Sequence, residues 1–492
     1  MAEQAGRERM SSVDTAWLRM DRPTNLMVIV GVDVFDGPVD YERLRGVVQE
    51  RLLGFRRFRQ RVEFDATGSA WWVDDDEFDL DHHLQRHRLG GLGGDAELQR
   101  FTAELAVLPL DPDRPLWQFH LVDGYKGTSA MLVRIHHCIA DGIALVRVML
   151  GLTDMEEGAA AAQSGHDHTV ERDPAEVESN PWAPYLRPLT RGTVRAIETA
   201  GDVVAGSMHL ARQPERLVEY AQAGGQVLKD AAAIALLQSD SRTSLKGKPG
   251  VAKGVAWNEP LPLDDVRVVC KALGASINDV LLSCVAGAMR TYLRGCGEDT
   301  RGVEIRAMVP VNLRPADEVL QLGNRFGLVP LTLPVGIANP IARVQEVRRR
   351  MDELKGGYQA VLAYGLLATV GRAPRLLQEP ILDYVASKAT AVMTNVPGPR
   401  AQLSLAGRKL TRMLFWVPQS GDVGLGVSIL SYAGGVQFGV IADRKLCPHP
   451  QRLIDAFAPE FEKLVLVVAM LPPEMLFHGE LDPEQLEHAL LG

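Results

Sequence analysis

Two adjacent histidines, followed closely by an aspartate and a glycine, are the residues of this chain best suited to do chemistry. His136 and His137 end an apolar stretch, and Asp141-Gly142 begins four residues after His137. An imidazole on an apolar face is desolvated, which favours its neutral form, and neutral imidazole accepts a proton near neutral pH. The pattern therefore predicts a general base that serves group transfer to a hydroxyl or an amine.

The apolar stretch predicts a β-strand over residues 129–137, and side chains alternate between the two faces of a strand. His137 is then expected to share a face with Val133 and Ile135, while His136 points to the opposite face. Adjacent strand residues do not easily chelate one metal ion, and no further histidine has a recognisable ligand spacing. We therefore expect no metal, and we assign the base to His137.

Two interpretations of Asp141 remain open. It could orient His137, as in a catalytic triad, or it could be structural, pairing with an arginine and holding a turn that Gly142 permits. We favour the structural role. No Gly-x-Ser-x-Gly segment occurs in the chain, so direct transfer is simpler than a covalent acyl-enzyme. The alternative for the whole motif is a pair of core histidines with satisfied hydrogen bonds.

Periodicity and turn residues predict the elements that must hold this motif. In the first part of the chain we expect strands over 26–35 and 116–122, a helix capped by Asp40, and a hairpin through 123–127 in which Val122 pairs with Thr128. In the second part we expect a helix from Ser276 and a hairpin that joins 427–432 to 436–442. The composition of residues 156–180 predicts a linker. That of residues 190–237 predicts a helical connection with a break at Pro214.

Composition narrows the class of protein. The chain has 492 residues and a net charge of −9, which favours more than one domain and argues against nucleic acid as the main partner. Five cysteines without ligand spacing indicate free thiols. The amino terminus has no apolar core, and no apolar run reaches the ~20 residues of a membrane span. We expect a cytoplasmic protein that at most lies on a membrane surface.

At this point the residues resemble a known family. His136-His137-x-x-x-Asp141-Gly142 is similar to the signature of CoA-dependent acyltransferases and of peptide-synthetase condensation domains. Further segments, in the same order, resemble bacterial wax ester synthase/acyl-CoA:diacylglycerol acyltransferases. These segments are Ser11-Ser12-Val13-Asp14, Pro115-Leu116-Trp117, Ser276-Ile277-Asn278-Asp279-Val280, Val309-Pro310-Val311-Asn312-Leu313-Arg314, Gly323-Asn324-Arg325-Phe326-Gly327 and Thr394-Asn395-Val396-Pro397-Gly398-Pro399.

The resemblance implies a fold of α/β (α+β) class with two similar chloramphenicol-acetyltransferase-like domains, whose mixed sheets are flanked by helices and meet along an active-site tunnel. We expect an N-terminal domain over 1–155, a linker and helical connection over 156–250, and a C-terminal domain over 251–492. Part of the C-terminal domain is expected to cross to the N-terminal one, and we assign this crossing to residues 395–399 and to the hairpin at Val427.

The resemblance also implies site residues. His137 would be the general base, with His136, Asp141 and Gly142 holding its loop. Pro115, Leu116 and Trp117 would line the acyl pocket, although Trp117 could equally pack in the core with Phe119 and Leu121. Thr394 and Asn395 are assigned to substrate binding.

Asn278 and Asp279 open the helix expected at Ser276. Ser276 and Asp279 loosely fit a capping box, so Asp279 is expected to cap the helix. Asn278 would lie at the positive end of this helix and could donate to an oxyanion, or it could be purely structural.

The resulting hypothesis is an O-acyltransferase that moves a fatty acyl group from acyl-CoA to a long-chain alcohol or diacylglycerol, making wax ester or triacylglycerol. Acyl-CoA would be a co-substrate, with no permanently bound cofactor and no metal. Peripheral association with the inner membrane or a lipid droplet is expected. The alternatives are an enzyme that uses carrier-protein thioesters, and a catalytically silent lipid-binding protein on the same scaffold.

Overall fold

The computed structural model describes residues 7–66, 68–155, 239–312, 323–324, 326–354, 363, 384 and 386–470. The expected linker over 156–180 and the helical connection over 190–237 lie outside these residues. The division of the chain at residues 155 and 250 stays a prediction.

Among the described residues, a first mixed sheet carries the histidine motif. Its strands follow the order β5 (Leu84–Arg88), β6 (Trp117–Tyr125), β7 (Thr128–His136), β2 (Val28–Phe35), β15 (Arg408–Trp416), β14 (Leu403–Leu405) and β8 (Asp154–Met155). Every residue of β2 is buried, because both faces of the sheet are covered. A hydrophobic core forms around this sheet and contains Trp117, Phe119 and Leu132.

The hairpin of β6 and β7 is tighter than the sequence suggested. The turn consists of Lys126 and Gly127, both with positive φ, which matches the twist of the flanking strands. β6 therefore continues to Tyr125, with an irregular register near Asp123. Val122 pairs with Ala130, so the expected pairing of Val122 with Thr128 was wrong by two residues.

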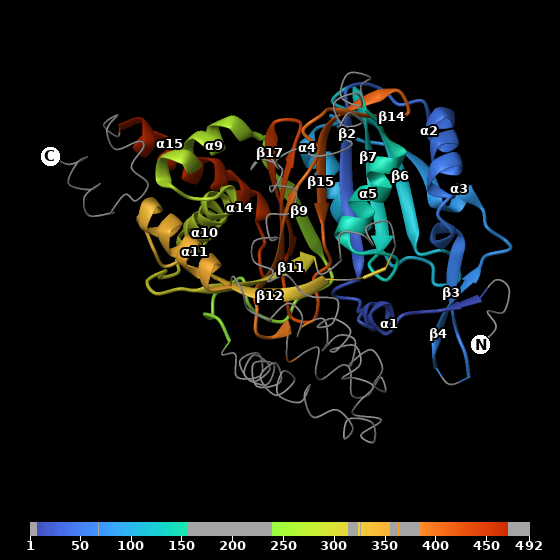
Figure 1. Ribbon diagram of the computed structural model, residues 1–492, viewed down its shortest axis with the longest axis horizontal. Helices are drawn as coiled ribbons and strands as arrows, with labels where there is room; N and C mark the ends of the chain where they lie inside the picture. Colours follow the sequence, from blue (N-terminus) through green and yellow to red (C-terminus); the bar gives the residue numbers. More distant parts are fainter. Residues whose placement is uncertain are drawn as a thin grey trace, which may run out of the picture.

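A second sheet is built from the later part of the chain. Its strands follow the order β10 (Leu261–Pro262), β17 (Gly435–Asp443), β16 (Leu425–Tyr432), β13 (Ala391–Pro397), β11 (Ile305–Asn312) and β12 (Phe326–Leu333), and β9 (Lys253–Trp257) also pairs with β17. The expected hairpin is confirmed as β16 and β17. Helices α9 (Leu263–Leu273), α10 (Ile277–Gly295), α11 (Pro340–Leu354), α14 (Pro450–Asp455) and α15 (Phe457–Met470) gather on its outer side (Figure 1).

The two sheets are joined by strands that the sequence did not identify. β15 pairs along β2, and β14 pairs with β15 and β8, so residues 403–416 complete the first sheet. The parts to which the crossing was assigned, residues 395–399 and the hairpin at Val427, belong to β13, β16 and β17 of the second sheet or follow directly on β13. That assignment was therefore wrong, although a segment of the second half of the chain does cross to the first sheet.

Helices and a small sheet complete the first half of the chain. The helices are α1 (Ser12–Arg19), α2 (Tyr41–Val47), α3 (Leu80–His83), α4 (Asp95–Ala106) and α5 (Gly142–Leu152), with a π-helix over Val48–Leu52 and a 3₁₀ helix over Arg56–Arg59. The small sheet has the order β1 (Arg7–Arg9), β4 (Ala70–Asp74) and β3 (Gln60–Phe64). Asp40 caps α2 by accepting from the Arg43 amide, as its position predicted.

Within the described part of the chain, no single helix combines the length and apolarity that crossing a membrane requires. α9 and α10 would meet that requirement only as a pair, and they are bent by 100° at their junction.

Candidate functional site

The histidine motif lies where β7 ends and the chain turns toward α5. The strand stops at His136, one residue earlier than expected, but the His137 amide still donates to the Met27 carbonyl at 2.7 Å. The Cys138 amide then donates to Nδ1 of His136 at 3.1 Å. These bonds hold the main chain of His137 and fix the direction of the His136 imidazole.

His136 is held by the first sheet and by a carboxylate. Its amide donates to the Leu116 carbonyl at 2.9 Å, and its Nε2 lies 3.2 Å from Asp21 Oδ2. The side chain is buried, while that of Asp21 is partly exposed. His136 therefore has the surroundings of a residue that supports the loop.

His137 lies in different surroundings, packed between aromatic rings. Its ring stacks on Trp17 of α1 with a centroid distance of 4.4 Å and an interplanar angle of 17°, and Phe326 lies 5.2 Å away on another side. Burial lowers the pKa of His137 to about 4, while its own backbone, Asp141 and Asn324 act in the opposite direction. The imidazole is therefore neutral at physiological pH and able to accept a proton.

A buried bridge ties the His137 main chain to both halves of the molecule. Nδ2 of Asn324 donates to Oδ1 of Asp14 and to the His137 carbonyl, both at 2.7 Å. The Asn324 amide donates to the same carboxylate at 3.2 Å. Burial raises the pKa of Asp14 to about 6, and its hydrogen bonds with Asn324 and Ser11 oppose this. One amide side chain thus connects α1, the segment before β12 and the histidine motif.

Asp141 is the N-cap of α5. Its Oδ1 accepts from the Ala144 amide at 2.9 Å, and its own amide donates to the Gly323 carbonyl at 3.3 Å. A structural role for this carboxylate is thus visible, as the cap of a helix, and its pairing with an arginine stays a prediction. Gly142 is the first residue of α5 and has no left-handed backbone, so the turn does not require glycine here. A Cβ at Gly142 would meet no atom within 4 Å.

Pro115, Leu116 and Trp117 lead into β6, beside the motif. Trp117 is fully buried, donates through Nε1 to the Phe58 carbonyl at 2.8 Å, and stacks on His83 at 4.6 Å. Its ring also contacts that of Phe119, as its shared strand face predicted. The segment therefore packs in the core of the first sheet, and the Leu116 carbonyl supports His136.

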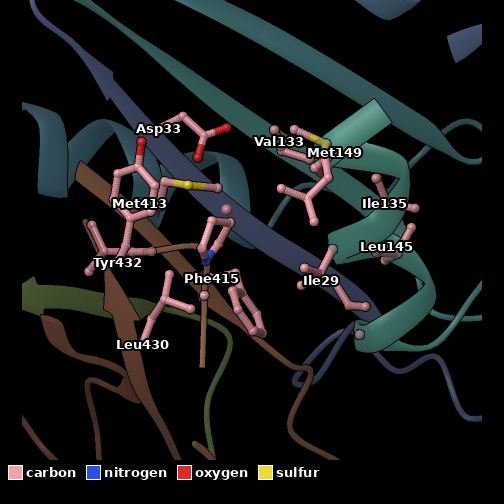
Figure 2. A pocket seen from close by; sticks show the side chains of 17 residues that line it. Ile29, Asp33, Val133, Ile135, Leu145, Met149, Met413, Phe415, Leu430 and Tyr432 are labelled. Carbon is pink, nitrogen blue, oxygen red and sulfur yellow. The ribbon is translucent and has the colours of Figure 1, made fainter. Parts of the chain in front are cut away.

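An apolar cavity of about 70 Å³ lies between α5 and the face of the first sheet that carries Ile29 and Ile135 (Figure 2). Ile135, which precedes the histidine motif, and Gly142, its last residue, are part of the cavity wall. The full lining is Ile29, Gly31, Asp33, Val133, Ile135, Gly142, Leu145, Val146, Met149, Leu150, Gly398, Pro399, Met413, Leu414, Phe415, Leu430 and Tyr432. Pro115, Leu116, Trp117 and His137 are not among these residues.

Asn278, Thr394 and Asn395 meet in the second sheet region. Asn395 donates through Nδ2 to Oδ1 of Asn278, and Thr394 donates to the Val427 carbonyl at 3.4 Å. Asn278 lies in the first turn of α10, where Ser276 and Asp279 form the expected capping box. These contacts run within the second half of the chain, whereas those of His137 run to α1 and to Asn324 and Phe326.

The predicted site residues therefore form two groups, one around the first sheet and one around the second sheet and α10. Sequence reasoning missed the parts that Trp17 and Phe326 play around His137, and it missed Asp33 in the cavity. Trp17 and Asp14 are three residues apart, a spacing that places both on one face of a helix, which is a usable signal. Asp33 interrupts the apolar strand Val28–Phe35, and this interruption is a second signal that the sequence offers.

The described side chains around the base form neither a metal site nor an activated thiol. In the described ranges, no three His, Cys, Asp or Glu side chains gather closely enough to hold a metal ion. Cys138, next to the base, is buried, and burial raises the pKa of its thiol well above the usual range. This thiol is therefore a poor nucleophile.

Comparison with family models gives two matches. Residues 10–281 match the wax ester synthase/diacylglycerol acyltransferase catalytic domain, and residues 322–465 match the WS/DGAT C-terminal domain. Together these segments contain the histidine motif, Asn324 and the crossing strands.

Comparison with known proteins gives matches over nearly the whole chain. A protein of Mycobacterium tuberculosis H37Rv, described as a probable diacylglycerol O-acyltransferase, is 29% identical over 484 residues, covering 93% of this chain and 96% of that protein. The solved wax ester synthase/diacylglycerol acyltransferase of Marinobacter aquaeolei VT8 aligns with a TM-score of 0.64 at 22% identity, covering 94% of this chain and 99% of that chain.

A condensation domain has a similar structure. The first condensation domain of the calcium-dependent antibiotic synthetase aligns with a TM-score of 0.58 at 17% identity, covering 95% of this chain and 97% of that chain. At these identities the solved structures establish the fold, which is the expected two-domain, chloramphenicol-acetyltransferase-like arrangement of mixed sheets.

Proposed function

This chain belongs to the wax ester synthase/diacylglycerol acyltransferase family, and on that premise we propose that it transfers a fatty acyl group from acyl-CoA to the hydroxyl of a diacylglycerol or a long-chain alcohol. O-acyl transfer is the activity that the family and its diacylglycerol acyltransferase relatives share by name. The products are triacylglycerol or wax ester, with free CoA.

The observation that carries the proposal is a neutral, buried imidazole beside an apolar cavity. Burial keeps His137 unprotonated, and the cavity wall includes Ile135 and Gly142, on either side of the two histidines. A long apolar chain fits such a wall, and a hydroxyl at its end would need a base at the motif. A histidine that is buried only for structural reasons does not require an apolar cavity beside it.

In the proposed mechanism His137 takes the proton of the acceptor hydroxyl as its oxygen attacks the thioester carbonyl. The tetrahedral intermediate then collapses, the carbon–sulfur bond breaks, and the leaving CoA thiolate receives the proton from the imidazolium. Burial disfavours the imidazolium, whereas Asn324 and Asp141 favour it. These two residues therefore act as positioning groups that help His137 to accept a charge during the reaction.

The oxyanion of the intermediate needs a donor, and we assign it to Asn278 or to backbone amides. Asn278 lies in the first turn of α10, at the positive end of the helix dipole. Its Oδ1 accepts from Asn395, which fixes the amide and turns its NH₂ group away from Asn395. Loss of one oxyanion donor typically costs ~10²–10³ in rate. Asn395 would support this amide rather than contact the acyl chain.

We also propose that the protein associates peripherally with a membrane or lipid droplet, since its substrates are lipids. Large apolar side chains are exposed on two helices of the second half, which pack against each other. They are Val268 of α9 and Leu466 and Met470 of α15. Such exposed residues are favourable at a lipid surface.

The experiment that tests the function supplies purified protein with palmitoyl-CoA and either hexadecanol or diacylglycerol, while free thiol and ester product are measured. We expect CoA release with ester formation, and a ~10²–10⁴-fold lower rate for His137→Ala. His120→Ala is the matched control, because His120 is also buried in the first sheet but contacts His87 away from the cavity.

Four outcomes contradict parts of the proposal. No CoA release with either acceptor rejects the activity, and release only from a carrier-protein thioester supports the condensation-type alternative. Equal rates in the wild type and His137→Ala reject the assigned base. Lipid binding without turnover supports the silent scaffold.

A further inference from the structure

Asp33 is a carboxylic acid in the wall of the apolar cavity. It lies in the middle of β2, where its neighbours across the sheet are Met131 and Met413. Its side chain is buried and lies beside Met413 and Val133, with Tyr432 below it (Figure 2). Among the described residues that line the cavity, it is the one with a carboxyl group.

The carboxyl group has no partner in the part of the chain that the structure describes. No hydrogen bond or ion pair connects it to a described residue, although the nearby Tyr432 hydroxyl accepts from the Leu403 amide and donates to the Leu410 carbonyl, both at 2.9 Å. Burial raises the pKa of Asp33 to about 7. A neutral carboxylic acid offers one donor and at least one acceptor, and leaving both unpaired costs stability.

The position of Asp33 relative to the base defines a distance. Val28 pairs with His136, the residue before the base, and Asp33 pairs with Met131, five residues further along β2. At ~3.4 Å per residue these two points are ~17 Å apart along the strand. The cavity wall extends from Ile29 and Ile135, near the motif, to Asp33 at its other end.

Resting on the proposed acyl transfer, we propose that this cavity binds the chain of a lipid substrate that carries a second hydroxyl far from its reacting end, and that Asp33 receives this hydroxyl. A hydroxyl donates and accepts at once, as the neutral carboxyl does. A cationic group fits less well, because a buried ion pair with no further polar neighbours bears a large desolvation cost. The chain between the two ends contacts Ile29, Val133 and Met149.

The chemistry is shared by two sources, a hydroxylated acyl chain and a hydroxylated alcohol acceptor. In both cases a substrate without the second hydroxyl leaves the Asp33 carboxyl without a hydrogen-bond partner. A site built to hydrogen-bond a hydroxyl discriminates strongly against analogues that lack it. We expect a ~10- to 100-fold preference in kcat/KM for the hydroxylated substrate in one of the two cases.

Two arms of one experiment separate these sources. In the acceptor arm, palmitoyl-CoA is supplied with 1,12-dodecanediol or 1-dodecanol, corrected for the two equivalent hydroxyls of the diol. In the donor arm, hexadecanol is supplied with 16-hydroxypalmitoyl-CoA or palmitoyl-CoA. Each ratio of kcat/KM is measured for the wild type, Asp33→Leu, Asp33→Asn and Met413→Leu.

We expect the preference to be lost or reversed in Asp33→Leu, and largely kept in Asp33→Asn, which retains a donor and an acceptor. Met413→Leu is the matched control, because it alters the same end of the wall without touching the carboxyl, and it should keep the preference. A wild type with equal ratios in both arms overturns the assignment, whether or not the variants fold. An equal preference in wild type and Asp33→Leu also overturns it. No CoA release with any substrate is the failure of the proposed function itself.

Discussion

Replacing Asn324 with alanine tests whether the bridge around His137 serves catalysis. Asn324 is buried and donates through its side chain to Asp14 and to the His137 carbonyl. Alanine removes both bonds, leaving a buried carbonyl without its donor and a buried carboxylate with one donor fewer. The bond to the carboxylate is charge-assisted, because the pKa of Asp14 is about 6 and the group is mostly ionised at neutral pH.

The magnitude has two parts. A neutral hydrogen bond contributes ~0.5–1.5 kcal/mol and one to a charged group ~1.5–3 kcal/mol, so Asn324→Ala should lower the free energy of unfolding by ~2–4 kcal/mol. The catalytic part arises because His137 loses an anchor on its own carbonyl, and a shift of ~1 Å in a reacting group can cost ~10²-fold. We expect kcat to fall ~10- to 100-fold while KM changes little.

The assay combines urea unfolding with steady-state CoA release, measured at a temperature where each variant remains folded. Asn258→Ala is the matched control, because Asn258 is also a buried asparagine with hydrogen bonds to Gln437 and Phe438, remote from the histidine motif. It should lose similar stability and keep its kcat. A double-mutant cycle with Asp14→Asn should show coupling of ~1 kcal/mol in stability.

Two results would refute this reasoning. If Asn324→Ala loses stability but keeps the wild-type kcat, the bridge is structural and does not position the base. If the unfolding free energy is unchanged, the hydrogen bonds of Asn324 contribute nothing net. An equal fall of kcat in Asn258→Ala would show that general destabilisation explains the loss.

Two further predictions concern His137 and Trp117. Since burial lowers the pKa of His137 to about 4, its neutral form persists as the pH falls from 7.5 to 5.5, and the rate limited by this base should stay nearly constant, whereas a base with the ordinary pKa of ~6.5 would fall to about a tenth. A fall in that window that disappears in Asp14→Asn would belong to Asp14, whose pKa is about 6. Trp117→Ala should lower the unfolding free energy by ~3–5 kcal/mol, because the ring is fully buried, while the preference between lauroyl-CoA and palmitoyl-CoA stays unchanged. A changed chain-length preference would place Trp117 in the acyl pocket instead.

Local patterns carried much of the prediction. The hairpin before the motif, the cap at Asp40 and the capping box of Ser276 and Asp279 depend on residues close together in sequence, and all three are confirmed. The different surroundings of His136 and His137 also follow from a local rule, the alternation of side chains along a strand. The structure gives His136 a carboxylate neighbour and gives His137 two aromatic ones.

The features that the sequence did not predict depend on contacts between distant residues. Nothing local distinguishes the crossing strands at 403–416 from strands of the second sheet, because β15 pairs with β2 and β14 with β8, both of which lie far earlier in the chain. The hairpin register depended on where the turn begins, and the tight turn at Lys126 was hidden by glycines on either side. The stacking of Trp17 on His137 joins residues 120 positions apart, and the sequence offered only the spacing between Trp17 and Asp14.

Two buried titratable groups lie toward opposite ends of one apolar region, and burial acts on both in the same sense. It favours the neutral form of both the His137 imidazole and the Asp33 carboxyl, by lowering the pKa of the first and raising that of the second. The difference lies in their neighbours, since Asn324 and Asp141 favour a charged His137, whereas no described side chain favours a charged Asp33. A group whose surroundings assist a transient charge suits proton transfer, and one without such assistance suits hydrogen bonding to a neutral ligand. The same physical effect therefore supports a base at one end of the region and a recognition group at the other.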